Sequence, residues 1–414
     1  MTKRRVVITG IGAISPVGHS AVELWESVKN GVCGIVPITH YDTTDRKVKL
    51  AGEVKDYKPE EFLDKKEARK MDKFCQFAMI AATEAFEDSQ LDMTKEDASR
   101  CGVIVASGIG GIGTYEVEHT KGMSKGYDRI SPFFIPMVIP NMAAAQIAIK
   151  YGLHGMSTCI VTACASSNNA IGDSFRQIRD NYADVMVCGG AEATITETTM
   201  GGFTSMKALT TEADPARASI PFDKERSGFV MGEGAGILVL EEYEHAKKRG
   251  AKIYGEVVGY AANCDGYHIT SPAPDGKYAG DCMSMAIADA GITPEQIGYI
   301  NAHGTSTPLN ERYETIAIKN AFGDYASKVM VSSTKSMTGH LLGASGAIEG
   351  IISTMALKDG YIPATIHYQV PDEECDLDVV PNEGRSIQVE YALSNSLGFG
   401  GHNASLVFKR YVEE

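Results

Sequence analysis

The stretch that decides the fold is TCIVTACASSNNAIGDSFRQIRD, residues 158–180. Its opening run CIVTA is short and apolar, which is typical of a buried strand. Beyond it, Ile171, Phe175 and Ile178 recur at the spacing of one helix face. The sequence therefore predicts a strand, a tight turn at Cys164 and then a helix, which is the building unit of an α/β protein.

The same alternation continues along the chain. Short apolar runs next to glycine predict further buried strands at residues 6–10, 102–108, 184–190, 236–241 and 253–259. Amphipathic segments predict helices at residues 21–31, 78–90 and 241–250. The α/β rhythm restarts near Gly250, so we expect an N-terminal half (residues 1–250) and a C-terminal half (residues 251–414). The segments SSNNAIGDSFRQI and HLLGASGAIEGII share a pattern, which indicates related halves.

Composition narrows the class of protein. The 414 residues include 53 acidic and 39 basic side chains, and a net charge of −14 argues against nucleic acid as a partner. Nine cysteines occur without a CxxC pair, which is typical of reduced thiols and predicts a cytoplasmic protein. No apolar run reaches the roughly 18 residues that a membrane helix needs, so we expect no membrane association.

Cys164 is a candidate nucleophile. Its predicted place beside a helix N-terminus offers unpaired N–H groups and a helix dipole, which we expect to lower the pKa of the thiol. Small neighbours would let a substrate approach, and the same turn offers N–H groups to an oxyanion. The alternative is a buried cysteine that only fills space, which is how we interpret Cys159 and Cys188.

Two histidines lie in small-residue contexts, His303 in YINAHGTSTP and His340 in STKSMTGHLLGASGAIEG. Neutral imidazoles there could donate hydrogen bonds to an enolate. Together with Cys164 they could instead bind a metal, but their spacing shows no local ligand pair, so we predict none. Lys335 and Glu349 flank His340, and spacing alone favours an ordinary surface pair over a buried one.

Three further motifs allow two interpretations each. ITGIGAISPVG and SGIGGIG are similar to dinucleotide-binding loops, but Pro16 interrupts the helix start that such a site needs. The run GFGG around Phe399 suits a hinged gate or a tight turn. DKKEARKMDKF, residues 64–74, predicts about two helical turns with Lys66, Lys70 and Lys73 on one face. That face would dock an acidic partner or simply be solvated.

Four motifs in order identify a family that the sequence resembles: GMSTCIVTACASSNNAI, NAHGTSTP, SSTKSMTGHLLGASGAIE and NSLGFGGHN. They resemble the β-ketoacyl-acyl carrier protein synthases, the type II condensing enzymes, and the resemblance covers nearly the whole chain. It implies a thiolase-like α/β fold, in which two related α/β halves form a five-layered αβαβα structure. It also implies a homodimer.

The resemblance implies a role for each matching residue. Cys164 would accept the acyl group, while His303 and His340 would promote malonyl decarboxylation and stabilise the enolate. The supporting residues would be Lys335 and Glu349 as an ion pair, and Phe399 as gate and oxyanion-hole donor. Substrate would contact Thr305, Thr307, Thr270 and Ile109, the last in the acyl pocket. The acidic carrier protein would dock on Lys65, Arg69, Lys70, Arg129 and Lys207.

The implied reaction is a decarboxylating condensation in type II fatty-acid elongation. An acyl group on Cys164 joins malonyl-acyl carrier protein to give 3-oxoacyl-acyl carrier protein two carbons longer, plus CO2. No cofactor is implied, because phosphopantetheine arrives on the acyl carrier protein. One departure is Glu311, where relatives often have Asp, which leaves a fixed hydrogen bond there open. Alternatives are a type I or polyketide ketosynthase, a thiolase acting on coenzyme A esters, and a non-catalytic carrier-protein binder.

Overall fold

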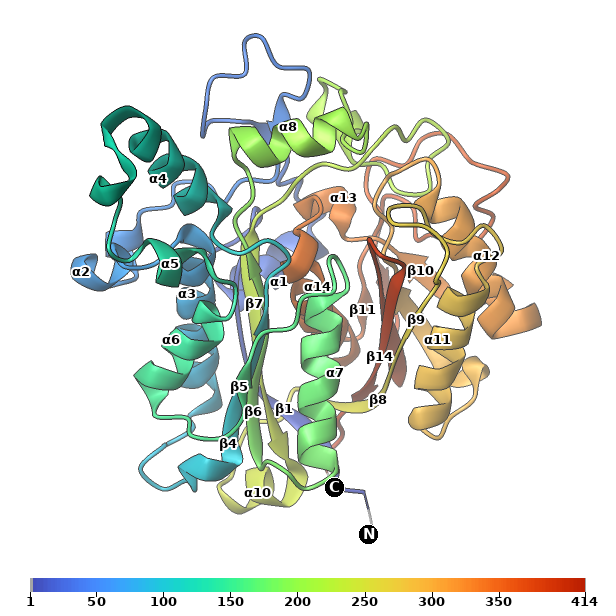
Figure 1. Cartoon of the computed structure of the whole chain (residues 1–414). Coiled ribbons are helices and arrows are strands. Elements are labelled where there is room, and N and C mark those ends of the chain that lie inside the picture. The colour runs from blue at the N-terminus through green and yellow to red at the C-terminus, as the bar shows by residue number, and fades with distance from the viewer. Residues whose placement is uncertain (1–2, 414) are drawn as a thin grey trace.

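The computed structural model describes residues 3–413, and one large mixed sheet organises them (Figure 1). Its ten strands lie in the order β10-β9-β13-β14-β8-β1-β7-β6-β4-β5. Their bounds are β1 Val6–Ile14, β4 Cys101–Ala106, β5 Ser157–Thr158, β6 Val185–Glu192, β7 Gly234–Glu242, β8 Gly255–Cys264, β9 Ile297–Asn301, β10 Met330–Ser332, β13 Tyr391–Gly398 and β14 His402–Arg410. Each of the five apolar runs predicted beyond CIVTA contains most of a strand or its start, in β1, β4, β6, β7 and β8.

The sheet consists of two halves with the same topology. From the centre outward, β1-β7-β6-β4-β5 and β8-β14-β13-β9-β10 show the same sequence of antiparallel and parallel pairings. The halves join where Val6, Val7 and Ile8 of β1 pair antiparallel with β8. The predicted pair of related α/β halves is therefore present, while the boundary drawn at residue 250 stays a prediction.

Helices form three layers around the two halves of the sheet (Figure 1). Helices α3 (Lys73–Ser89) and α6 (Met142–Tyr151) cover the N-terminal half, and α11 (Lys277–Asp289) and α12 (Asn310–Phe322) cover the C-terminal half. Between the halves lie α7 (Ser166–Arg179) and α14 (Ser345–Asp359). Residues 345–357 of α14 are buried on every side, as a helix between two sheets requires.

The remaining elements surround this core. The helices are α1 Ala21–Lys29, α2 Lys65–Ala68, α4 Ile112–Lys125, α5 Phe134–Val138, α8 Glu197–Ser205, α9 Pro215–Ala218, α10 Tyr243–Lys248 and α13 Lys335–Thr338. The short strands are β2 Val36–Pro37, β3 Leu50–Ala51, β11 Tyr361–Ile362 and β12 Arg385–Ser386. Within residues 3–413, no helix combines the length and the apolar character that crossing a membrane requires.

The first glycine motif serves helix packing. Gly10 and Gly12 lie inside β1, directly beneath α3. A Cβ on Gly10 would lie 2.2 Å from the carbonyl oxygen of Ala85, and one on Gly12 would lie 2.0 Å from that of Ala81. Glycine at both positions lets the helix rest on the strand, so this segment is not a dinucleotide-binding loop.

Two sequence predictions need correction. The run CIVTA is not a buried strand, because β5 ends at Thr158 and Cys159 is half-buried. Strand β5 pairs with only one neighbour, β4, and the chain then leaves the sheet edge to form the turn at Cys164.

The basic segment 64–74 is not one continuous helix. Helix α2 ends at Ala68, and Asp72 starts α3 by accepting hydrogen bonds from the N–H groups of Phe74 and Thr114. The cap therefore breaks the helix before Lys73, whose ammonium turns inward to Glu233 at 2.7 Å. The expected shared face of lysines does not form.

Candidate active site

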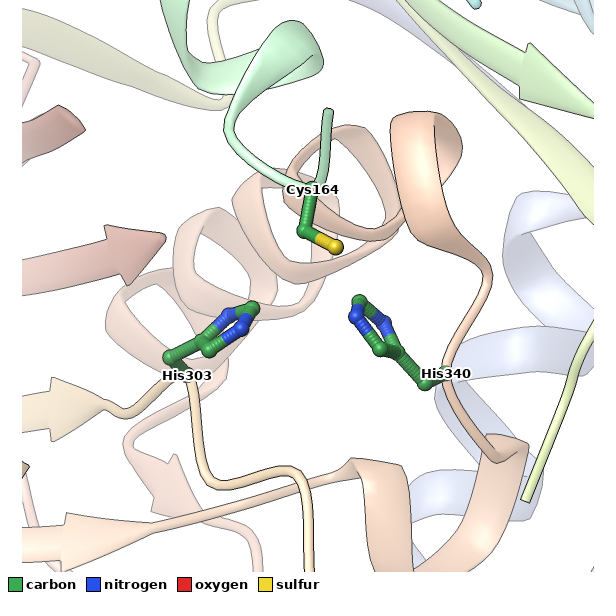
Figure 2. Close-up of side chains that lie close together, drawn as sticks. All are labelled: Cys164, His303 and His340. Carbon is green, nitrogen blue, oxygen red and sulfur yellow. The ribbon is translucent and has the colours of Figure 1, made fainter. Parts of the chain in front are cut away.

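Three reactive side chains from distant parts of the chain meet at one point (Figure 2). Cys164 lies in the turn before α7, His340 in the loop before α14, and His303 in the loop after β9. All three are buried, and the thiol sulfur and one nitrogen of each ring lie within 4.8 Å of one another. In Figure 2 the Cys164 side chain points toward the two imidazoles.

The relation between the two halves explains this meeting. Helices α7 and α14 hold equivalent places, since each follows the outermost strand of its half and runs through the middle layer. Cys164 and His340 therefore precede equivalent helices that lie side by side. The two segments whose pattern looked alike in the sequence are these two helix starts.

The turn at Cys164 is constrained. Ala163 has a positive φ of 50°, which is unusual for a residue with a side chain. The hydroxyl of Ser166 accepts a hydrogen bond from Thr162 N at 2.8 Å and donates one to Ala163 O at 2.6 Å. A Cβ on Gly398 would lie 2.6 Å from Thr162 O, so only glycine lets the end of β13 approach this turn.

The predicted lowering of the thiol pKa is wrong for the resting protein. Burial raises the pKa of Cys164 to about 12, while Lys335 and the N–H groups of Phe399 and Cys164 act in the opposite direction. The resting sulfur is therefore a thiol, because complete desolvation outweighs the nearby cation and N–H groups. Both N–H groups therefore lie within reach of the Cys164 sulfur.

Both imidazoles are neutral at physiological pH. Burial lowers the pKa of His303 and of His340 well below the usual range, and the Lys335 ammonium lowers both further. The rings lie edge to face with their centroids 5.2 Å apart. Nδ1 of His340 is hydrogen bonded to Ser345 Oγ at 2.9 Å. That contact leaves Nε2 of His340 available to a ligand.

Glu314 of α12 holds the His303 loop and was not singled out in the sequence. Its buried carboxylate accepts hydrogen bonds from His303 N at 2.7 Å and Gly304 N at 2.8 Å. The side-chain amide of Asn395 in β13 donates to the same carboxylate at 2.9 Å. Nothing in the local sequence marks Glu314, because its burial depends on where α12 meets β13.

Lys335 and Glu349 form a buried ion pair rather than a surface pair. Their side chains are 1% and 3% exposed. Burial raises the pKa of the Glu349 carboxyl, and Lys335 opposes that rise. The ammonium also acts on Cys164, His303 and His340, and after burial it is the largest influence on the pKa of each.

A cavity of about 600 Å³ opens beside the three reactive groups. Of the other predicted residues, its walls include Ile109, Lys207, Thr270, Thr305, Thr307 and Phe399. The hydroxyls of Thr305 and Thr307 lie 3.0 Å apart on this wall. The Phe399 ring packs against Phe203 at 6.2 Å between centroids. Two glycines with positive φ, Gly400 and Gly401, follow Phe399.

Glu311 does form a fixed hydrogen bond despite its extra methylene. Its buried carboxylate accepts from Ser306 N and lies 3.3 Å from the Arg226 guanidinium. Arg226 in turn donates to the carbonyl oxygens of Thr307 and Pro308, each at 3.0 Å. Arg226, which the sequence analysis missed, thus holds the threonine loop in place together with Glu311.

The predicted docking residues do not meet within one chain. Lys207 lies at the cavity, just after α8, whereas Lys65 and Arg69 belong to the α2 region at the left edge of Figure 1. Both of these α2 residues and Arg129 are exposed, while Lys70 is half-buried and pairs with Glu67 at 2.9 Å.

Cys164, His303 and His340 could also hold a metal ion. One sulfur and two nitrogens in such proximity suit a soft divalent cation. The absence of a local ligand pair in the sequence carries little weight, because the fold brings the groups together. The predicted absence of a metal stays a prediction.

Comparison with known proteins identifies the family. Residues 3–246 match the beta-ketoacyl synthase N-terminal domain, and residues 254–369 match the beta-ketoacyl synthase C-terminal domain. The chain belongs to the β-ketoacyl synthase family. A 3-oxoacyl-[acyl-carrier-protein] synthase 2 from Synechocystis sp. is 52% identical over 412 residues, which is 99% of each chain. One from Staphylococcus aureus (strain COL) is 52% identical over 408 residues, also 99% of each.

Solved structures of β-ketoacyl synthases and ketosynthases share the fold. A type II polyketide ketosynthase in complex with its acyl-carrier protein aligns with a TM-score of 0.92 at 36% identity. It covers 99% of this chain and 100% of its own. A β-ketoacyl synthase from Burkholderia phymatum gives 0.91 at 32% identity, with the same two coverages. The predicted family, thiolase-like fold and acyltransferase class are confirmed.

The buried ion pair yields the first prediction. Lys335→Met leaves Glu349 without its countercharge, so we expect the free energy of unfolding to fall by about 3–5 kcal/mol. Replacing both residues by Met removes both charges and is expected to restore most of that loss. Urea denaturation of the single and double variants measures both effects.

The matched control is Lys58→Met. Lys58 pairs with Glu61 at 3.0 Å, but both side chains are more than half exposed. We expect a change of less than about 1 kcal/mol there. A Lys335→Met variant as stable as Lys58→Met would contradict the assigned role of the buried pair.

Proposed function

We propose that the chain catalyses the decarboxylating condensation of an acyl group with malonyl-acyl carrier protein in type II fatty-acid elongation. The observation that supports this most is a buried thiol close to two neutral imidazoles and to the backbone N–H groups of Cys164 and Phe399. The names of the relatives, 3-oxoacyl-[acyl-carrier-protein] synthase 2, support carrier-protein substrates.

Acyl transfer comes first. An imidazole nitrogen takes the proton of the Cys164 thiol as the sulfur attacks the thioester carbonyl. The oxyanion that forms accepts hydrogen bonds from the N–H groups of Cys164 and Phe399. The bond to the phosphopantetheine sulfur then breaks, and the imidazolium returns its proton to that leaving thiolate. Because the pKa of Cys164 is raised, the sulfur is protonated before substrate binds, and the imidazole removes this proton during the attack.

Condensation follows on the same groups. The malonyl carboxylate leaves as CO2, and the electrons of the broken bond form an enolate. N–H groups of His303 and His340 donate hydrogen bonds to the enolate oxygen, because each neutral imidazole still carries one N–H group. The enolate carbon attacks the acyl-Cys164 carbonyl, the carbon–sulfur bond breaks, and the thiolate takes up one proton from solvent, which the overall reaction consumes. The 3-oxoacyl product is two carbons longer.

The thiolase alternative is disfavoured at one position. The resemblance would place the second catalytic cysteine of a thiolase in the GHNA segment, where this chain has His402. A non-catalytic binder would not need the buried Lys335–Glu349 pair or the Glu314 contacts that hold His303.

The reaction predicts distinct defects for the three groups. Cys164→Ala removes the nucleophile, so we expect no mass gain when the protein is mixed with acyl-acyl carrier protein. His303→Ala or His340→Ala each removes one donor to the enolate, so CO2 release from malonyl-acyl carrier protein should fall about 10²- to 10³-fold. Intact-protein mass spectrometry and a CO2 assay measure these effects.

Controls come from residues of the same type outside the site. Cys33→Ala should still form the acyl adduct, and His154→Ala, an exposed residue, should keep the wild-type rate of CO2 release. An adduct on Cys164→Ala, or an unchanged CO2 rate in both histidine variants, would overturn the assignment.

We propose that the acidic carrier protein docks on Lys207 beside the cavity and on four further basic residues, Lys65, Arg69, Lys70 and Arg129. All of them except the half-buried Lys70 are exposed, and their positive charge in a chain of net charge −14 supports this proposal. We also propose a cytoplasmic location, which the nine free thiols support.

Charge reversal tests the docking surface. Lys65→Glu, Arg69→Glu and Lys70→Glu together should weaken carrier-protein binding at least about tenfold and flatten its dependence on salt. Surface plasmon resonance at several salt concentrations measures both. The matched control reverses three lysines elsewhere, Lys95, Lys248 and Lys328, with the same change in net charge. Equal effects of the two triple variants would show that only total charge matters.

We propose a homodimer formed through β5. This strand has one neighbour within the chain, so its outer edge carries unpaired backbone groups. Apolar side chains stay exposed around it, among them Met156 at 50%, Val161 at 54% and Ile149 at 74%. Pairing of two β5 strands across a two-fold axis would cover this edge and these side chains.

The dimer proposal predicts the mass in solution. Sedimentation velocity at micromolar concentration should give twice the mass of one chain. Val161→Asp places a charge among these exposed apolar side chains and should shift the protein to monomer. Val22→Asp, at a valine on α1 that is more exposed than Val161, should leave the dimer intact. A monomeric wild-type chain would contradict the proposal.

A further inference from the structure

Glu192 is a buried carboxylate that the proposed chemistry does not use. It is the last residue of β6 and its exposed fraction is 0%. Burial raises its pKa to about 7, while the N–H groups of Gly108, Gly343 and Ile109 and the hydroxyl of Ser107 act in the opposite direction. Burying a carboxylate costs more free energy than burying an apolar residue, so we expect Glu192 to have a structural role.

Every hydrogen-bonding partner of Glu192 is a donor from one of two loops. The first loop follows β4 and supplies Ser107 Oγ at 3.0 Å, Gly108 N at 2.7 Å and Ile109 N at 3.2 Å. The second follows His340 and supplies Gly343 N at 3.0 Å. The carboxylate therefore ties together two loops that lie more than two hundred residues apart in sequence.

Close packing reinforces this tie. A Cβ on Gly108 would lie 2.8 Å from a carboxylate oxygen of Glu192, and one on Gly343 would lie 2.3 Å from Gly108 N. The carbonyl of Gly343 also accepts a hydrogen bond from Ser167 at the start of α7. The two loops can approach this closely only because both positions are glycine.

The tied loops form part of the cavity wall. Gly108, Ile109 and Leu342 line the cavity. Leu342 belongs to the same apolar cluster as Cys164, and Ile109 packs against that cluster. Leu342 has a positive φ of 47°, a conformation that its surroundings must enforce. The position of this wall beside the nucleophile thus depends on where the carboxylate holds the two loops.

We propose that Glu192 is a positioning residue that fixes the Ile109–Leu342 wall of the cavity and so restricts the length of acyl group that Cys164 accepts. The inference rests on the proposed function, because it concerns the acyl group carried on Cys164. A short acyl group does not reach past this wall, whereas a long one must displace it. Weakening the hydrogen bonds of Glu192 to the two loops should therefore favour transfer of long acyl groups over short ones.

Glu192→Gln is the sharpest test. Three of the four partners are backbone N–H groups, and of the four only the Ser107 hydroxyl can turn to accept, so the NH2 group of glutamine faces at least one N–H group that it cannot pair with. We expect the ratio of hexadecanoyl to butanoyl transfer rates onto Cys164 to rise about tenfold, as for the loss of one or two hydrogen bonds. Intact-mass time courses with the two acyl-carrier protein donors give this ratio, which is insensitive to the fraction of folded protein.

Two further variants separate positioning from general stability. Ser107→Ala removes one donor and should raise the ratio less, by about threefold. Glu241→Gln alters an equally buried carboxylate of β7, held by Arg249 at 2.7 Å outside the cavity wall, and should lower stability without changing the ratio. If Glu192→Gln fails to fold, Ser107→Ala still decides the matter.

The outcomes distinguish a failure of the proposed function from a failure of the proposed role of Glu192. Wild-type protein that forms no adduct with either donor would overturn the proposed function itself. Wild-type protein that forms adducts, with a ratio that Glu192→Gln and Ser107→Ala leave within about twofold, would overturn only the role of Glu192. A rise in the ratio for Glu241→Gln equal to that for Glu192→Gln would also overturn it.

Discussion

Helices α7 and α14 lie side by side between the two halves of the sheet, and the reactive centre depends on how closely their N-terminal ends approach (Figure 1). A Cβ on Gly346 would lie 2.5 Å from Asn168 Oδ1, so glycine is required where the helices meet. Because each helix start follows directly from a reactive side chain, this contact brings Cys164 and His340 together. His303 joins them from the end of a neighbouring strand.

Burial then decides the charge of each group. In water, the thiol and imidazoles would have ordinary pKa values, but complete desolvation favours their neutral forms. Glu349 neutralises the Lys335 ammonium, so Lys335 polarises the site without adding net charge. A neutral thiol and two neutral imidazoles can pass a proton among themselves and donate hydrogen bonds to an anion that forms later.

The local sequence predicted helix α7 and the family, whereas the helix break at Asp72 depends on contacts between distant parts of the chain. The apolar spacing of Ile171, Phe175 and Ile178 identified α7, and motif order identified the family before any geometry was known. The break at Asp72 escaped prediction because its carboxylate caps α3 and also bonds Thr114 from another helix. A capping side chain with a distant partner leaves no periodic signal.

Buried charge was the hardest property to read from sequence. Glu192 is the last residue of an apolar strand and was not singled out in the sequence. Its carboxylate accepts hydrogen bonds from two loops that no local sequence pattern connects. Lys335 and Glu349 looked like a surface pair, because spacing along the chain does not report burial. The thiol pKa was expected to fall, because helix-start effects are visible in sequence and the desolvation that outweighs them is not.

The charge of the two imidazoles is the central claim, and nuclear magnetic resonance of the protein with isotopically labelled histidine tests it most directly. His303→Ala and His340→Ala assign the two ring signals. The account predicts that both rings stay neutral as the pH falls from 8 through 6.5, the ordinary pKa of histidine. A positive charge on either ring at neutral pH would contradict it, because desolvation and Lys335 would then not control the site.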